Sequence, residues 1–189
     1  MELDIGPLKN PTNMRNKLLL VPLGELDYIL INKLASGLAS FFNFNLEILP
    51  GMELPQEAYN EKRGQYYSSV ILSKLELLKA DDRERVLGIT EEDLYVPTLN
   101  FVFGESDPES GVAVISLFNL KQDYSGITPT ETMYFERIFK ESVHELGHTM
   151  NLNHCPNPKC VMYFSNTILD TDRKGVKFCD NCQRNIRLI

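Results

Sequence analysis

Apolar residues in the first eighty positions switch between two periodicities. Residues 17–23 form a short aliphatic run that suits a buried strand, and residues 44–48 alternate between apolar and polar side chains, which is typical of a strand with one buried face. The segments that follow each run carry apolar residues at the spacing of one helix face. These two helical sets are Leu30, Ile31, Leu34, Leu38 and Phe41, and Tyr67, Ile71, Leu75 and Leu78. The pattern therefore predicts strands and helices in alternation.

Three further strands are expected in the middle of the chain, at residues 85–89, 99–103 and 112–118, with a turn at residues 104–108 between the last two. This order predicts a twisted mixed sheet with helices packed on it, so we expect an α/β or α+β fold. The length of 189 residues and the hydrophobic content of 43% fit a single globular domain over residues 1–189.

A longer helix is expected over residues 129–150. The Thr-Pro-Thr-Glu segment at residues 128–131 reads as a capping box with proline at the first helical position. Apolar residues at helical spacing then form one stripe that can pack on the sheet; they are Phe135, Phe139, Val143, Leu146 and Met150. His144 and His148 project roughly opposite this stripe, so we expect them to face a cleft.

All three histidines of the chain lie within residues 144–154, and this concentration indicates a metal site. His144 and His148 are one helical turn apart and can bind one Zn²⁺ ion, while Glu145 between them can hold a water beside it. His154 can reach the same ion only if the helix ends before it, and Asn151 is suited to the left-handed conformation of such an end. Three imidazoles leave a fourth position for water, which is typical of catalytic zinc, and Glu145 is then the expected general base.

The four cysteines of the chain form two short-spaced pairs, Cys155 with Cys160 and Cys179 with Cys182. This arrangement is typical of four thiolates around a second, structural zinc ion. The alternatives are two disulfides or a redox-active C-x-x-C. Residues 1–7 lack the basic and apolar regions of a secretory signal, which favours a reducing, cytoplasmic compartment and therefore the zinc site. We expect two zinc ions per chain. Residues 1–152 would form the sheet and the active-site helix, and residues 153–189 a C-terminal subdomain in which the structural ion holds the segment that presents His154.

The histidine segment resembles the metzincin metallopeptidases, whose pattern is H-E-x-x-H-x-x-G-x-x-H followed by a methionine turn. Asn151 stands at the glycine position. The continuation C-x₄-C-x-M and a later C-x-x-C resemble the archaemetzincin family, and so do residues 86–90 and 100–104. The resemblance implies that Met162 lies in the methionine turn, as a floor under the imidazoles, although a lone methionine is more often core filler. It also gives Tyr163 a role near the metal, with ordinary packing as the alternative.

The same resemblance implies a zincin-like fold: a mostly parallel sheet of about five strands with one antiparallel edge strand, an active-site helix and a small zinc-bound C-terminal part. An extended peptide substrate would lie along the edge strand, for which we expect residues 99–103. Composition limits the other partners. The net charge of −7 argues against nucleic acid, and no apolar run is long enough to span a membrane. We expect a monomer.

The sequence thus predicts a zinc-dependent metallopeptidase in which His144, His148 and His154 bind the catalytic ion and Glu145 moves the proton. One alternative is a zinc-binding regulatory or interaction protein with little turnover, which Asn151 and the lack of a visible prosegment favour. A third is a hydrolase that uses the same chemistry on a non-peptide amide, because sequence does not distinguish the two kinds of amide.

Overall fold

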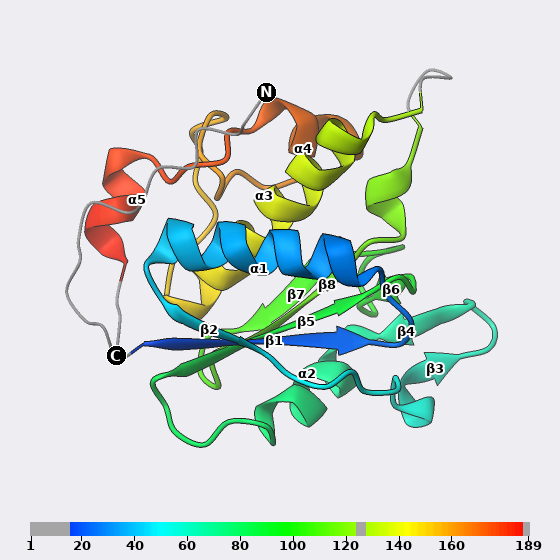
Figure 1. Ribbon diagram of the computed structural model, residues 1–189. Helices are drawn as coiled ribbons and strands as arrows, with labels where there is room; N and C mark the ends of the chain where they lie inside the picture. Colours follow the sequence, from blue (N-terminus) through cyan, green and yellow to red (C-terminus); the bar gives the residue numbers. More distant parts are fainter. Residues whose placement is uncertain (1–15, 124–127, 187–189) are drawn as a thin grey trace.

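A computed structural model describes residues 16–123 and 128–186, and the expected absence of a signal concerns residues 1–7, which lie outside these ranges. Its centre is a five-stranded sheet with the strand order β2-β1-β5-β8-β7 (Figure 1). Four strands are parallel and β7 pairs antiparallel with β8, as the resemblance implied. The bounds are β1 Lys17–Leu23, β2 Asn45–Ile48, β5 Glu84–Thr90, β7 Gly104–Asp107 and β8 Val112–Ser116.

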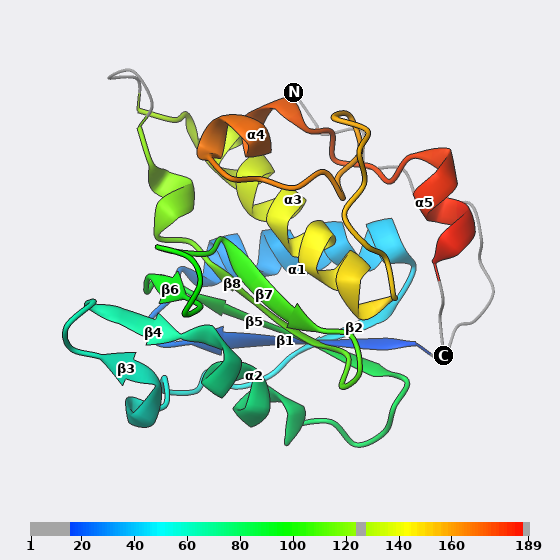
Figure 2. The same cartoon turned by 180° about the vertical axis from the view of Figure 1, so that it is seen from behind.

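Helices cover both faces of this sheet. Helices α1 (Tyr28–Phe42) and α3 (Glu131–Thr149) pack on one face, and α2 (Ser68–Glu76) packs on the other (Figures 1 and 2). Successive strand residues alternate between the two cores: Leu18 and Leu20 of β1 join α1 and α3, whereas Leu19 and Val21 join α2. Burial on both faces explains why these strands read as continuous apolar runs.

Shorter elements complete the fold. A second sheet has the order β3-β4-β6 and lies beside the carboxyl end of β1 (Figure 2). The remaining bounds are η1 Gln56–Ala58, β3 Tyr59–Asn60, β4 Gln65–Tyr67, β6 Leu94–Tyr95, η2 Asn119–Lys121, α4 Ile168–Arg173 and α5 Asp180–Asn185. No helix among the described residues is both long enough and apolar enough to cross a membrane.

Two predictions about the edge of the sheet were wrong. Residues 99–103 form no strand, and the edge strand is Gly104–Asp107, where a turn was expected. The carbonyls of Leu99 and Asn100 accept hydrogen bonds from the Arg63 guanidinium, and within this segment Val102 alone forms an isolated bridge, in which its N–H donates to the Leu94 carbonyl of β6 at 2.9 Å. A polar strand is stable at the edge because its side chains are only half-buried.

The start of the long helix also differs from the prediction. Its N-cap is Thr130, whose hydroxyl accepts a hydrogen bond from the Met133 N–H, and not Thr128 at the start of the expected capping box. The helix ends at Thr149, one residue before the expected end. These differences at the ends of the helix leave the histidine face unchanged, because the apolar spacing that predicted this face lies within the observed helix.

Candidate metal centres and catalytic cleft

The structure brings the three histidines together at the end of α3. His144 and His148 lie on the last two turns, and each histidine offers a ring nitrogen within 4.8 Å of the others. His144 is buried, His148 half-buried and His154 exposed. Because donor atoms from two separate segments converge on one point, the cluster has the arrangement that a metal ion requires.

The chain reverses after α3 as the sequence predicted. Asn151 adopts the left-handed conformation with φ 62°, and the Leu152 N–H donates to the Gly147 carbonyl at 3.1 Å. This turn returns the chain towards the helix and places the His154 ring 4.8 Å from the His148 ring, centroid to centroid. Asparagine is the side chain besides glycine that adopts this conformation most readily, so its presence at the glycine position leaves the turn intact.

Hydrogen bonds define the tautomers of two of the imidazoles. His144 Nδ1 lies 2.8 Å from the Val161 carbonyl and His148 Nδ1 lies 2.7 Å from the Leu152 carbonyl. A carbonyl only accepts, so each Nδ1 carries the proton and each Nε2 presents a lone pair. The two Nε2 atoms are 3.1 Å apart, which is close to the roughly 3.3 Å edge of a tetrahedron with Zn–N bonds of about 2.05 Å. Two lone pairs at this distance repel unless a cation lies between them.

Burial keeps these imidazoles neutral. It lowers the pKa of His148 to about 4 and lowers the pKa of His144 well below its ordinary value, and the Lys174 ammonium and the other imidazoles add to the effect at His144. The pKa of the more exposed His154 is also lowered, mainly by burial. Neutral imidazole is the form that binds metal, so the three residues fit a zinc ion at neutral pH.

The Glu145 side chain extends from α3 to the edge strand β7. It is buried, and Oε2 accepts a hydrogen bond from the Ser106 hydroxyl at 2.7 Å. Burial raises the pKa of Glu145 to about 8, and the Ser106 hydrogen bond opposes this rise. A carboxyl with a pKa near neutrality is suited to accept and return a proton.

The histidines and Glu145 line a cleft of about 460 Å³. The rest of the cleft has one apolar wall, an edge-strand wall and a segment that follows Met162, and its residues are Val96, Leu99, Asn100, Phe101, Val102, Phe103, Gly104, Glu105, Ser106, Pro108, Glu141, Phe164, Ser165 and Asn166. Phe164, and not the expected Tyr163, is among these residues, and its ring lies 4.7 Å from that of His154, centroid to centroid. Met162 is buried against Gly147, between the turns that carry His144 and His148, which fits the expected floor.

A buried ion pair lies behind His144. Lys174 Nζ is 3.0 Å from Glu141 Oε1, with the lysine side chain fully buried and that of the glutamate 3% exposed. The Thr171 hydroxyl donates to the same carboxylate at 2.7 Å, and Lys174 Nζ lies 3.4 Å from His144 Nδ1. Glu141 precedes His144 by three residues on one helix face, so helical spacing could have indicated it. No local pattern identifies Lys174 or Ser106.

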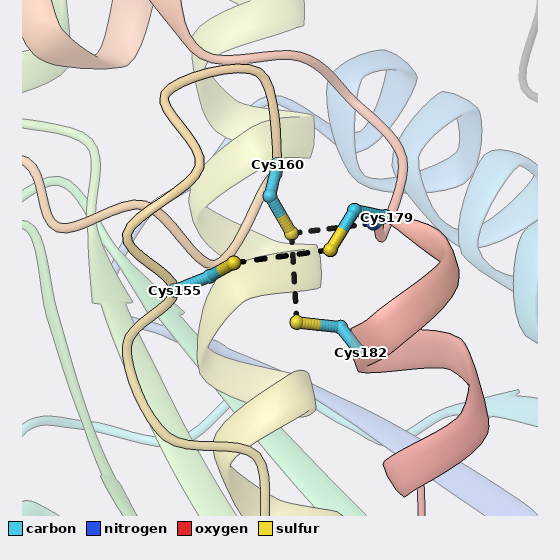
Figure 3. Close-up of side chains that lie close together, drawn as sticks. All are labelled: Cys155, Cys160, Cys179 and Cys182. Atoms are coloured by element: carbon cyan, nitrogen blue, oxygen red, sulfur yellow. Dashed lines mark hydrogen bonds between the residues drawn. The ribbon is translucent and has the colours of Figure 1, made fainter.

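The four cysteines converge at a second point (Figure 3). The Sγ atoms of Cys155 and Cys179 are 3.8 Å apart, and those of Cys160 and Cys182 are 3.7 Å apart. A disulfide requires about 2.05 Å. A tetrahedron with Zn–S bonds of about 2.3 Å has edges of roughly 3.8 Å, so the four thiols fit a zinc ion with no open position. Cys155 directly follows His154, so the two clusters are adjacent along the chain.

The model for peptidase family M54 matches residues 42–188 of the chain. The chain belongs to this family. It is 40% identical over 179 residues to the archaemetzincin of Pyrococcus furiosus, with 92% of this chain and 93% of the relative covered. It is 45% identical over 139 residues to the archaemetzincin of Methanopyrus kandleri, with 71% and 75% covered.

Solved structures share the fold. The archaemetzincin of Archaeoglobus fulgidus in complex with malonate gives a TM-score of 0.78 at 38% identity over 90% of this chain and 99% of that one. A zinc-dependent peptidase from Methanocorpusculum labreanum gives 0.80 at 28% identity over 89% and 98%. The predicted archaemetzincin resemblance and fold class are thus confirmed. The chain is a zinc metallopeptidase that acts on peptide or protein substrates, and none of these comparisons favours the regulatory alternative.

Proposed function

We propose that His144 and His148, through their Nε2 atoms, and His154, through a ring nitrogen, bind the catalytic zinc ion and that Glu145 is the general base for peptide hydrolysis. The observation that carries this proposal is that the Nε2 atoms of His144 and His148 face each other at 3.1 Å, while each Nδ1 donates its proton to a backbone carbonyl. A zinc ion there would supply Lewis acidity towards the scissile carbonyl and lower the pKa of a water molecule.

Glu145 supplies the proton transfers in this proposal. Its Oε2 accepts the Ser106 hydrogen bond, which leaves Oε1 to accept a proton from the attacking water and to return it to the leaving amine. Burial favours the protonated carboxyl, whereas a nearby cation favours the carboxylate, so the residue can hold either form near neutral pH.

We infer that the peptide backbone binds along β7. This strand ends the sheet order, so one of its edges has no partner strand within residues 16–123 and 128–186, and Gly104, Glu105 and Ser106 line the cleft. A peptide in extended conformation can pair with such an edge through its backbone, and the apolar wall that includes Leu99 and Phe101 can contact its side chains. In this proposal β7 takes the place of residues 99–103, which were expected to be the substrate-binding strand.

The second part of the proposal is a structural zinc ion bound by Cys155, Cys160, Cys179 and Cys182, which gives two ions per chain. Its role would be to hold the segment that presents His154, because Cys155 directly follows that histidine. The Cys155 N–H also donates to the Met162 carbonyl at 2.8 Å, which fixes the same segment. Cysteines that form no disulfide are typical of a reducing compartment, which supports a cytoplasmic location. We retain a monomer that binds neither nucleic acid nor membrane, organised as one domain with residues 153–189 as a subdomain.

The deciding experiment compares wild type, Glu145→Ala and Glu131→Ala on a mixed peptide library, with and without a chelator. Glu131 is an exposed glutamate in the first turn of the same helix, so it is a matched control. We expect chelator-sensitive cleavage by wild type and Glu131→Ala, and a loss of about 10²- to 10⁴-fold in Glu145→Ala. Full activity of Glu145→Ala would refute the general-base role.

Metal analysis tests the two sites separately. We expect two zinc ions per wild-type chain, and one after His154→Ala or after mild chelation, because three imidazoles hold zinc less tightly than four thiolates do. Cys179→Ser should weaken zinc binding at the histidines as well. If it left both peptidase activity and the catalytic zinc affinity unchanged, the coupling between the sites would be wrong.

A further inference from the structure

The hydrogen bond between Ser106 and Glu145 connects two elements that are far apart in the sequence. Ser106 lies on the edge strand β7, and Glu145 lies near the end of α3. The Ser106 hydroxyl donates to Glu145 Oε2 at 2.7 Å, within a part-buried contact. A hydroxyl that donates to a buried carboxylate forms one of the stronger hydrogen bonds in proteins, so it can restrict the rotation of the carboxylate.

Gly104 makes this approach of strand and helix possible. Gly104 and Ser106 are two residues apart and pair with Ile115 and Ala113, whose side chains belong to the core that contains α3. Both residues therefore face the helix. A Cβ atom at Gly104 would lie 2.6 Å from Glu145 Cγ and 2.8 Å from the Val114 carbonyl oxygen. The Glu145 side chain thus passes directly over the backbone of Gly104 before it meets the Ser106 hydroxyl.

The neighbouring carboxylate on β7 is held in a similar way on the other face of the sheet. Glu105 pairs with Val114, which belongs to the core on the α2 side, and it accepts a hydrogen bond from the Ser69 hydroxyl at 2.8 Å. The two contacts have the same chemistry, a serine hydroxyl on a carboxylate, at adjacent residues of one strand. Only the contact to Glu145 involves a group that our proposed mechanism uses. Ser69 is therefore a natural control for Ser106.

We propose that Ser106 is a positioning residue for Glu145: it holds Oε2, with Gly104 as the cradle, so that Oε1 carries the proton in peptide hydrolysis. This inference rests on the proposed function of Glu145. The strand that holds the base is also the strand whose free edge would pair with the peptide backbone. The same four-residue strand would therefore position both the base and the scissile bond, so a small shift of β7 would move both together.

Steady-state kinetics on zinc-loaded protein test this role with Ser106→Ala, Ser106→Thr and Ser69→Ala. We expect kcat of Ser106→Ala to fall about tenfold, a fraction of the full general-base effect of about 10²- to 10⁴-fold, while KM stays within about twofold. Ser106→Thr keeps the hydroxyl and should restore kcat to within about threefold of wild type. Ser69→Ala should match wild type in both constants.

A readout that is independent of activity uses the zinc-free protein. The urea midpoints of wild type, Ser106→Ala, Glu145→Ala and the double variant form a cycle. We expect the double variant to lose less stability than the two single losses added together, because the single variants remove the same hydrogen bond. We also expect the zinc affinity of Ser106→Ala to equal that of wild type, since the Ser106 hydroxyl donates its hydrogen bond to Glu145 and not to an imidazole.

Three results would overturn the inference: an unchanged kcat in Ser106→Ala, a kcat loss that Ser106→Thr does not restore, or additive effects in the cycle. Each of them leaves the proposed function standing as long as Glu145→Ala abolishes cleavage. Conversely, full activity of Glu145→Ala would refute the proposed function itself, whatever Ser106→Ala does.

Discussion

Replacing Lys174 by methionine should strongly destabilise the protein, because it leaves the Glu141 carboxylate buried without its cation. The two side chains are 0% and 3% exposed, and Nζ lies 3.0 and 3.1 Å from the two carboxylate oxygens. Breaking a buried pair from one side costs about 3–5 kcal/mol. The hydroxyls of Thr171 and Ser165 remain on the carboxylate, and two neutral donors do not balance its charge. At about 2–4 °C per kcal/mol for a chain of this size, Tm should fall by roughly 6–20 °C.

The assay is urea and thermal unfolding of Lys174→Met, the double variant Glu141→Gln with Lys174→Met, and Lys74→Met. The double variant removes both charges and should recover most of the loss, because an uncharged buried pair of similar volume is often nearly neutral. Lys74 pairs with Glu57 at 2.8 Å on the surface, with side chains 45% and 58% exposed, so its loss should cost less than about 1 kcal/mol. If Lys174→Met behaved like Lys74→Met, or the double variant were as unstable as the single one, the buried-charge reasoning would be refuted.

Three further predictions concern the C-terminal end of α3. Gly147→Ala should destabilise the protein by about 1–3 kcal/mol in urea unfolding, because a new Cβ would meet Met162 and lie 2.9 Å from Phe178. This steric cost should exceed the helix preference of alanine over glycine, about 1 kcal/mol, so a more stable variant would contradict the prediction. Asn151→Gly should keep full peptidase activity and gain up to about 1 kcal/mol, since φ is 62°, and a loss of activity would mean that the amide itself is needed. Because burial lowers the pKa of His148 to about 4, its imidazole in the zinc-free protein should stay neutral down to about that pH when its ring protons are followed by NMR. Titration near pH 6.5, the ordinary value for histidine, would show that burial has no such effect.

The parts of the structure that the sequence revealed depend on local spacing. His144 and His148 share a helix face wherever the helix packs, because they are four residues apart. Each cysteine pair is likewise recognisable from its short spacing alone. Asn151 marked the helix end because few side chains tolerate its backbone conformation. The apolar runs of β1 and β5 were recognisable because burial on both faces removes every polar residue but those at the ends.

The parts that were missed depend on contacts between distant segments. Residues 104–107 are polar and contain glycine, so their local preference is for a turn, and only the pairing with β8 makes them a strand. Ser106 and Lys174 act through Glu145 and Glu141, which lie 39 and 33 residues away in the chain. Thr128 and Thr130 are equally good caps by composition, so local sequence does not choose between them.

The unpaired edge of β7 has a consequence for which proteins can be digested. A chain segment can pair with that edge only if its own backbone groups are free, and those in helices or central strands are already bonded to their neighbours. Compact proteins would therefore resist attack until the relevant stretch opens, and their degradation rate would follow the free energy of that opening. Tails, unstructured linkers and damaged or heat-disrupted proteins would be degraded first, while intact folded proteins in the same mixture would persist.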